Sequence, residues 1–120
     1  MTPKPTDGEL EILQVLWRLG GGTVRDLHAD IQKRKESSYN TTLKLLQIMN
    51  EKGIVERDET RRPQVYRAKL PEEQMQRRLF ADMMKRVFGG SARKLAQAIT
   101  AGDVSKAELT EIRKLLEKSR

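Results

Sequence analysis

Residues 37–70 constrain the fold of this chain more than any other stretch, because a helical pattern there runs directly into a predicted hairpin. The helical pattern ends at Lys52-Gly53, and two short runs rich in strand-forming residues follow at residues 54–57 and 65–69. A polar tip with two adjacent arginines, residues 58–63, separates the two runs. Two further helical segments precede this stretch. The order helix, helix, helix, hairpin predicts a winged helix, whose third helix can enter the major groove of DNA while the hairpin reaches the neighbouring backbone.

The two helices before residue 37 carry clear start signals. The first begins with the capping-box sequence of residues 6–9, in which the Thr hydroxyl and the Glu carboxylate each satisfy a free amide group. Apolar residues then recur at helical spacing until the three glycines of residues 20–22 end the helix. The second helix begins at Thr23, with Asp26 three residues later. It ends at the basic run 33–35, where cations suit either a helix C-terminus or a DNA phosphate.

The third helix is expected to have one buried and one exposed side. It begins near Ser37 or Ser38, either of which can cap it. With about 100° between successive residues, the buried side consists of Thr42, Leu45, Leu46 and Met49. The opposite side carries Asn40, Lys44, Gln47 and Glu51, with Thr41, Leu43 and Ile48 on its flanks. Side chains of Asn, Lys, Gln and Thr can read base edges in the major groove, although they also suit a polar exterior.

The hairpin tip presents a second candidate contact with DNA. Gly53 suits the left-handed position that ends the third helix, and Pro63 belongs at the tip because it cannot donate a hydrogen bond within a sheet. Arg61 and Arg62 are then exposed by the geometry of the turn. They are either a solvated pair of charges or a contact with phosphates or the minor groove, and their position beside a candidate recognition helix favours the contact.

After Pro71 the sequence predicts helices only, and these helices carry more apolar surface than they can bury among themselves. A ridge with i+4 spacing runs along the first of them, and a capping-box sequence at residues 105–108 begins the last. This region either packs on the first domain or pairs with a second copy of the chain. We therefore expect a mainly α protein, with a winged helix-turn-helix DNA-binding domain at residues 1–70 and a helical dimerisation region at residues 71–120. The candidate dimerisation residues are Met75, Leu79, Met83, Val87, Leu109, Ile112, Leu115 and Leu116.

Composition excludes several other classes of protein. The formal charge of +7 is spread over both halves of the 120-residue chain, so DNA binding would depend on shaped patches rather than on a polycationic tail. Without cysteine there is no disulfide, thiolate metal site or thiol nucleophile. His28 is the only histidine, and no cysteine or second histidine can join it to hold zinc. We therefore expect it to be an interior or boundary residue. Trp17 lies on an apolar stripe and is expected in the core. We expect a cytoplasmic protein that is no enzyme and has no cofactor, metal or small-molecule substrate.

Several segments, taken in order, carry a family resemblance. Residues 6–17, TDGELEILQVLW, are similar to the opening helix of the BlaI/MecI family of bacterial transcriptional repressors, the penicillinase repressors. Residues 23–27, TVRDL, resemble its second helix, and residues 39–44 and 51–55 resemble its recognition helix and the turn that follows. Tyr66 stands where the family closes its wing. The later sequences Phe88-Gly89-Gly90-Ser91 and Ser-x-x-Glu-Leu at residues 105–109 resemble the family's dimerisation region.

The resemblance implies a homodimer that represses transcription from a dyad-symmetric, double-stranded DNA operator. It also implies a partner, a membrane-bound sensor protease that relieves repression by cutting the C-terminal half. This chain has Gln97-Ala98-Ile99-Thr100 where well-known members carry Asn-Phe, which is a departure from the pattern of that cut. The candidate DNA-binding residues are Ser38, Tyr39, Asn40, Thr41, Lys44, Gln47, Arg61 and Arg62.

A second hypothesis is a winged-helix module whose basic faces dock an acidic protein partner, and a third is an architectural protein that binds DNA without regard to sequence. The polar face of the third helix distinguishes the repressor hypothesis from these two. A protein-binding face is more often apolar or aromatic, and an architectural protein needs few groups that read bases. A sequence-specific DNA-binding repressor is therefore the favoured interpretation.

Overall fold

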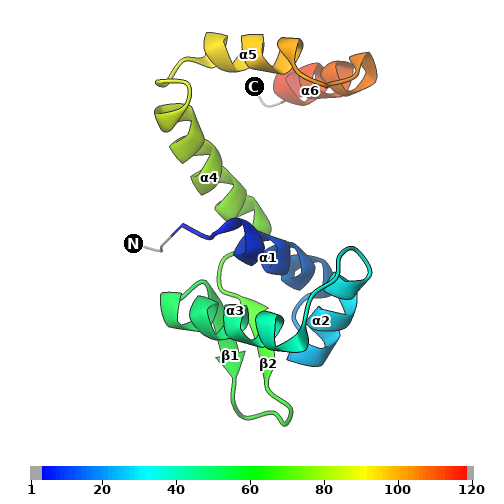
Figure 1. The fold of residues 1–120 in the computed structure, drawn as a ribbon. Helices are drawn as coiled ribbons and strands as arrows, with labels where there is room; N and C mark the ends of the chain where they lie inside the picture. The colour runs from blue at the N-terminus through cyan, green and yellow to red at the C-terminus, as the bar shows by residue number, and fades with distance from the viewer. Residues whose placement is uncertain (1–3, 119–120) are drawn as a thin grey trace. The chain divides into compact units, whose positions relative to one another are not determined.

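The computed structural model describes residues 4–118, which form two compact units, one ending at Arg77 and the other beginning at Arg78. The first unit contains α1 (Asp7–Leu19), α2 (Val24–Gln32), α3 (Tyr39–Lys52), β1 (Val55–Asp58) and β2 (Val65–Ala68), which are labelled in Figure 1. α4 (Glu72–Arg86) begins in the first unit and continues into the second, which also contains α5 (Ala92–Ala101) and α6 (Lys106–Lys118). The prediction of a winged helix followed by a helical region is confirmed.

Local sequence fixes where the first three helices begin. Thr6 accepts a hydrogen bond from the backbone of Glu9, and the Glu9 carboxylate accepts one from the backbone N–H of Thr6 at 2.9 Å. Thr23 and Asp26 form the same reciprocal pair at the start of α2. Ser38, one of the two predicted caps, begins α3. Each pair satisfies amide groups that would otherwise lack a partner in the first helical turn, so these boundaries could be predicted from sequence.

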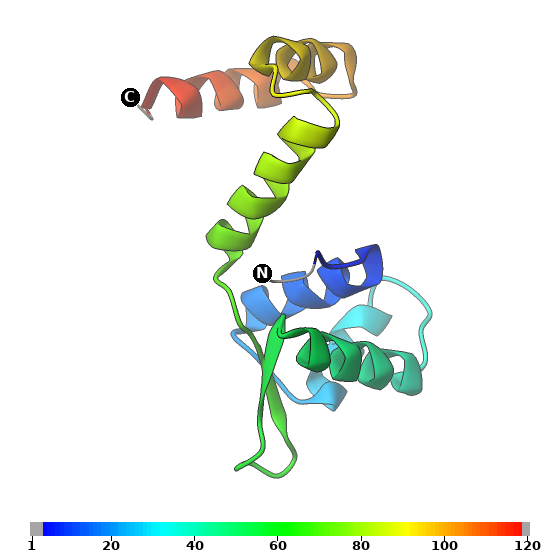
Figure 2. The same cartoon turned by 90° about the vertical axis from the view of Figure 1, so that its left-hand side faces the viewer.

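The core of the first unit lies where the three helices meet the hairpin. The deepest side chains come from every element of the unit and include Leu13, Leu27, Leu46, Met49 and Tyr66, each at most 2% exposed. In Figure 1 the hairpin strands start behind α3 and run across its direction, and in Figure 2 the hairpin extends beyond the helices. The apolar stripes predicted for α1, α2 and α3 therefore converge on one core, with their polar sides directed outward.

The three glycines after α1 do more than end the helix. Gly20 adopts the left-handed conformation that caps α1, with φ of 78°. Gly22 then pairs with Tyr66 in β2, through backbone hydrogen bonds of 3.0 and 2.8 Å. Gly21 has φ of 118°, a conformation that strains any other residue, and a Cβ atom there would lie a tight 3.0 Å from the Tyr66 carbonyl oxygen. The glycines thus let the α1–α2 connection bond directly to the wing.

The hairpin is a two-stranded antiparallel sheet in which Val55 pairs with Ala68 and Asp58 pairs with Val65. The first strand is one residue later than predicted. Ile54 instead bridges helix and sheet, since its N–H donates to the Met49 carbonyl at 3.0 Å and its carbonyl accepts from the Lys69 N–H at 2.9 Å. The backbone therefore passes from α3 into the wing without a flexible linker.

Two features connect the segment after the hairpin, including the start of α4, to the first unit. Trp17, predicted for the core, is half-buried, and its indole N–H donates to the Leu70 carbonyl at 2.9 Å. Met75, in the second turn of α4, is only 3% exposed. The start of α4 thus belongs to the core of the first unit.

A buried ion pair joins the first turn of α1 to the last residue of α3. The Glu9 side chain is 2% exposed, and both of its carboxylate oxygens accept from the Lys52 ammonium, at 2.9 and 3.0 Å. Burial alone raises the pKa of Glu9, but hydrogen bonds from Thr6 and the charge of Lys52 outweigh it and lower the pKa below the ordinary value of 4.5. The start of α1 is in this way tied to the end of α3.

The second unit has no comparable interior. None of the residues 78–118 is buried, although α4, α5 and α6 all carry apolar side chains. α5 and α6 line a shallow apolar groove of about 420 Å³ that includes Ile99, Leu109 and Ile112. Helices of this kind gain most of their stability from burying an apolar face, so this unit exposes a face that a partner can cover.

We predict that Glu9→Gln destabilises the first unit by about 1–3 kcal/mol at neutral pH, because it removes charge-assisted hydrogen bonds to a buried group. The folded-state pKa of Glu9 lies below 4.5, so the charged carboxylate stabilises the fold above about pH 4.5 and this contribution is lost as the pH falls further. Urea unfolding of both proteins between pH 7 and about pH 3 measures this, and the two stability curves should converge in acid. Curves that stay parallel over the whole range would contradict this role for Glu9.

Candidate nucleic-acid interface

The exposed side of α3 is polar, as predicted. Asn40, Thr41, Lys44 and Gln47 are all exposed. On the other side Thr42, Leu46 and Met49 are buried, and Leu45 is half-buried, which confirms the predicted inner face. The helix therefore offers amide, ammonium and hydroxyl groups to a ligand along its outer surface.

The first turn of α3 is held by its own side chains. The Ser38 hydroxyl oxygen accepts from the Thr41 N–H at 3.1 Å, and the two hydroxyl groups lie 2.8 Å apart. Both candidate contact residues thus take part in the helix cap. The free N–H groups and positive dipole end of this turn suit an anion such as a phosphate.

His28 fixes α2 against the start of α3. Its Nδ1 atom lies 3.1 Å from the Thr42 hydroxyl, and its ring meets the Tyr39 ring edge to face, with centroids 5.8 Å apart. His28 is half-buried, as expected for a boundary residue. Tyr39 remains 47% exposed, so the contact orients the ring while leaving much of its surface free.

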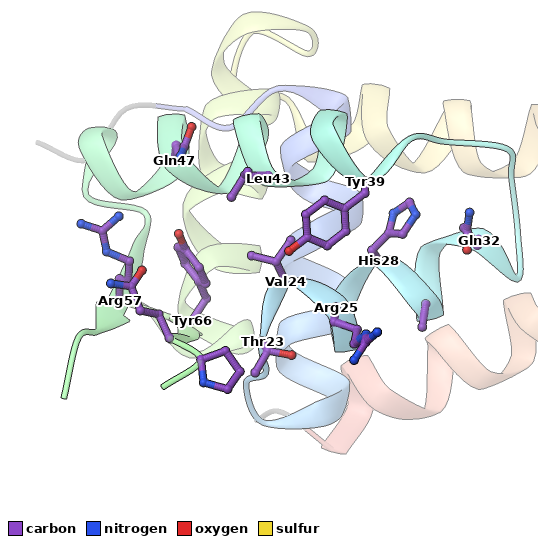
Figure 3. Close-up of a pocket in the computed structure, with 13 residues that line it drawn as sticks. Thr23, Val24, Arg25, His28, Gln32, Tyr39, Leu43, Gln47, Arg57 and Tyr66 are labelled. Atoms are coloured by element: carbon purple, nitrogen blue, oxygen red, sulfur yellow. The ribbon is translucent and has the colours of Figure 1, made fainter. Parts of the chain in front are cut away.

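A groove of about 770 Å³ is lined by side chains of α2, α3 and the hairpin. Figure 3 shows side chains from all three elements directed into the same space. α2 contributes Val24, Arg25 and His28, α3 contributes Tyr39, Leu43 and Gln47, and the hairpin contributes Arg57 and Tyr66. The groove is open, and its lining mixes apolar side chains such as Val24 and Leu43 with cationic ones, Arg25 and Arg57. Its open form suits an extended partner better than a small enclosed ligand.

The hairpin tip is more balanced in charge than two adjacent arginines suggest. Arg61 Nε lies 3.6 Å from an Asp58 carboxylate oxygen, and Arg62 donates to the Glu59 carbonyl at 2.8 Å. Asp58 in turn accepts from the N–H and hydroxyl of Thr60, and these bonds lower the pKa of Asp58. The Asp58 carboxylate thus closes the turn, while the Arg61 side chain stays 62% exposed.

Two cations at this surface were not among the predicted contacts. Arg25, in the first turn of α2, is exposed and lines the groove. Arg57 on β1 lines it from the hairpin side. The sequence could have predicted the position of Arg57, because side chains along a strand alternate between its two faces. Arg57 lies two residues after the buried Val55, so it shares that face and points toward the helices.

The predicted dimerisation residues differ in accessibility. Met75 is the exception, since it is only 3% exposed within its own chain and leaves a partner almost no surface to contact. Val87 and Leu116 are both 68% exposed, and Leu115 is 56% exposed. Met83 is 38% exposed, and the remaining members, Leu79, Leu109 and Ile112, are half-buried.

Within residues 4–118, no group of three or more His, Asp or Glu side chains could hold a metal ion. No helix in that same range is long and apolar enough to cross a membrane.

Comparison with known protein families decides the wider relationship. The model of the penicillinase repressor family matches residues 5–118, which takes in the winged helix and all three later helices. This chain belongs to the penicillinase repressor family. A comparison with curated proteins found no match. Membership of this family assigns the chain to transcriptional repressors. It also confirms the family resemblance that the sequence segments, taken in order, had indicated.

Proposed function

We propose that this penicillinase repressor relative is a homodimer that binds a dyad-symmetric DNA operator in a sequence-specific manner. The observation that supports this most strongly is the groove of the first unit, where α3, the start of α2 and the hairpin border one space. A winged helix arranged in this way fits a DNA duplex. Its helix can enter the major groove while its hairpin contacts the flanking strand.

In this proposal α3 is the recognition helix. Asn40, Lys44 and Gln47 face the floor of the major groove, because they occupy the centre of the exposed side of α3. Amide and ammonium groups there can form hydrogen bonds with base edges. Ser38, Tyr39 and Thr41 lie at the helix start and set its register against the backbone, and Arg61 and Arg62 contact phosphates or the minor groove from the hairpin tip.

Dimerisation is assigned to the second unit. Its helices bury none of their residues within residues 78–118, yet Val87, Leu115 and Leu116 present large apolar side chains to solvent. A second copy can cover these faces, and two-fold pairing is the commonest symmetry of soluble oligomers. Two recognition helices related by such an axis would read half-sites separated by roughly 34–36 Å per DNA turn.

Pairing also explains how one small winged helix can reach useful affinity. Once one half of the dimer is bound, the second half-site is met at a high effective concentration. Affinity then rises without additional base contacts in either half. The two units in this account have separate tasks, base recognition in the first and pairing in the second.

We predict that Lys44→Ala or Gln47→Ala costs roughly 1–3 kcal/mol of binding free energy on the preferred sequence and relaxes the preference at one base position. Competition between the preferred duplex and single-base variants measures this for each protein. Gln14→Ala, which removes an exposed glutamine on α1, is the matched control and should leave binding unchanged. Equal losses on every sequence, with the same preferred bases, would remove base readout from this side of α3.

We predict that Leu116→Gln shifts the protein from dimer toward monomer, since Leu116 is 68% exposed and is assigned to the pairing face. Leu19→Gln is the control, because Leu19 is 48% exposed on α1 in the first unit. Sedimentation equilibrium of both variants and the unchanged chain is the measurement. A dimer that is equally stable in all three proteins would exclude Leu116 from the interface.

A further inference from the structure

A winged helix that uses both α3 and its hairpin must let one DNA strand pass between them. The proposed function sets this geometry, and the present inference rests on it. A helix in the major groove and a hairpin on the far side of the flanking strand enclose the sugar-phosphate backbone of that strand. In this molecule the space between the two elements is the groove bordered by Gln47 on α3 and by Arg57 and Tyr66 on the hairpin.

Arg57 is the hairpin's cation at this groove. It lines the groove wall, and its side chain is only 28% exposed, whereas Arg61 at the tip is 62% exposed. β1 places it on the same side of the strand as the buried Val55. A phosphate group in the groove would therefore meet Arg57 before it met the arginines of the tip.

One edge of the Arg57 guanidinium is already occupied in the protein without DNA. Its Nε and Nη2 atoms donate to one carboxylate oxygen of Glu59, at 3.2 and 2.6 Å. Glu59 itself is 62% exposed at the start of the tip, so water can reach it and its side chain can move away. The hydrogen bonds from Arg57 to Glu59 raise the pKa of Arg57, so the arginine stays charged throughout.

A phosphate and a carboxylate bind an arginine through the same donor groups. Both accept hydrogen bonds from two N–H groups on one edge of the planar guanidinium, and the two anions cannot occupy that edge together. We propose that Arg57 binds the DNA backbone in this groove, and that Glu59 is an internal competitor for the Nε–Nη2 edge of its guanidinium. Glu59 thereby lowers affinity for DNA of every sequence and leaves discrimination to α3.

The neighbouring residue of β1 supplies a control of the same charge and size. Glu56 is exposed and lies one position before Arg57, so its side chain points to the opposite face of the strand. Glu59→Gln and Glu56→Gln change the net charge of the chain by the same amount. Any difference between their effects on DNA binding therefore reports the local contact with Arg57.

The test measures binding of the full-length chain to a duplex selected from random DNA and to a scrambled duplex, over a range of salt concentrations. Glu59→Gln should strengthen binding to both duplexes by about 2- to 5-fold, in keeping with the strength of an exposed ion pair. Arg57→Gln should weaken both and reduce the slope of log K against log salt by about 0.9, the value for one phosphate contact. In the Arg57→Gln background, Glu59→Gln should have no effect beyond that of Glu56→Gln. Thermal unfolding of each variant confirms that the hairpin still folds.

Two results would overturn the inference, and they differ in meaning. If the unchanged chain prefers the selected duplex but Glu59→Gln matches Glu56→Gln at every salt concentration, Glu59 does not compete for Arg57 and the proposed function is unaffected. If the unchanged chain shows no binding to either duplex, the proposed function fails and this inference fails with it.

Discussion

The buried ion pair between Glu9 and Lys52 holds the end of α3 against the start of α1. Glu9 sits in the first turn of α1 and Lys52 ends α3, so the pair joins elements that are 43 residues apart in sequence. The same carboxylate caps α1 through Thr6. A buried carboxylate without a partner is costly, so the pair favours the packing in which the end of α3 lies against the start of α1. At the other end of α3, the contact of Thr42 with His28 plays the corresponding part.

With both ends of α3 held, the hairpin has little freedom of its own. Ile54 continues the hydrogen bonding of α3 into β1, and Gly22 pairs with Tyr66 on the far strand. The wing is thus anchored to α3 on one side and to the α1–α2 connection on the other. In the proposed complex this anchoring matters, because side chains on α3 and on the hairpin would meet the same DNA strand in a fixed register.

Sequence was sufficient wherever a structure depends on neighbouring residues. The caps at Thr6, Thr23 and Ser38, the apolar faces of the first three helices and the hairpin after Gly53 follow from local patterns, and the family resemblance agrees with them. Contacts between distant residues could not be read in this way. The burial of Met75, the pairing of Gly22 with Tyr66 and the place of Arg57 in the groove all depend on how separate elements pack.

The central claim is that two copies of this chain read one symmetric operator. Selection of bound fragments from random DNA by the full-length protein tests it most directly, because neither the sequence nor the symmetry of the operator is assumed. The account predicts an inverted repeat whose half-sites lie one or more helical turns apart, roughly 10 base pairs per turn. Enrichment of a single unsymmetrical site, or of no sequence at all, would contradict it.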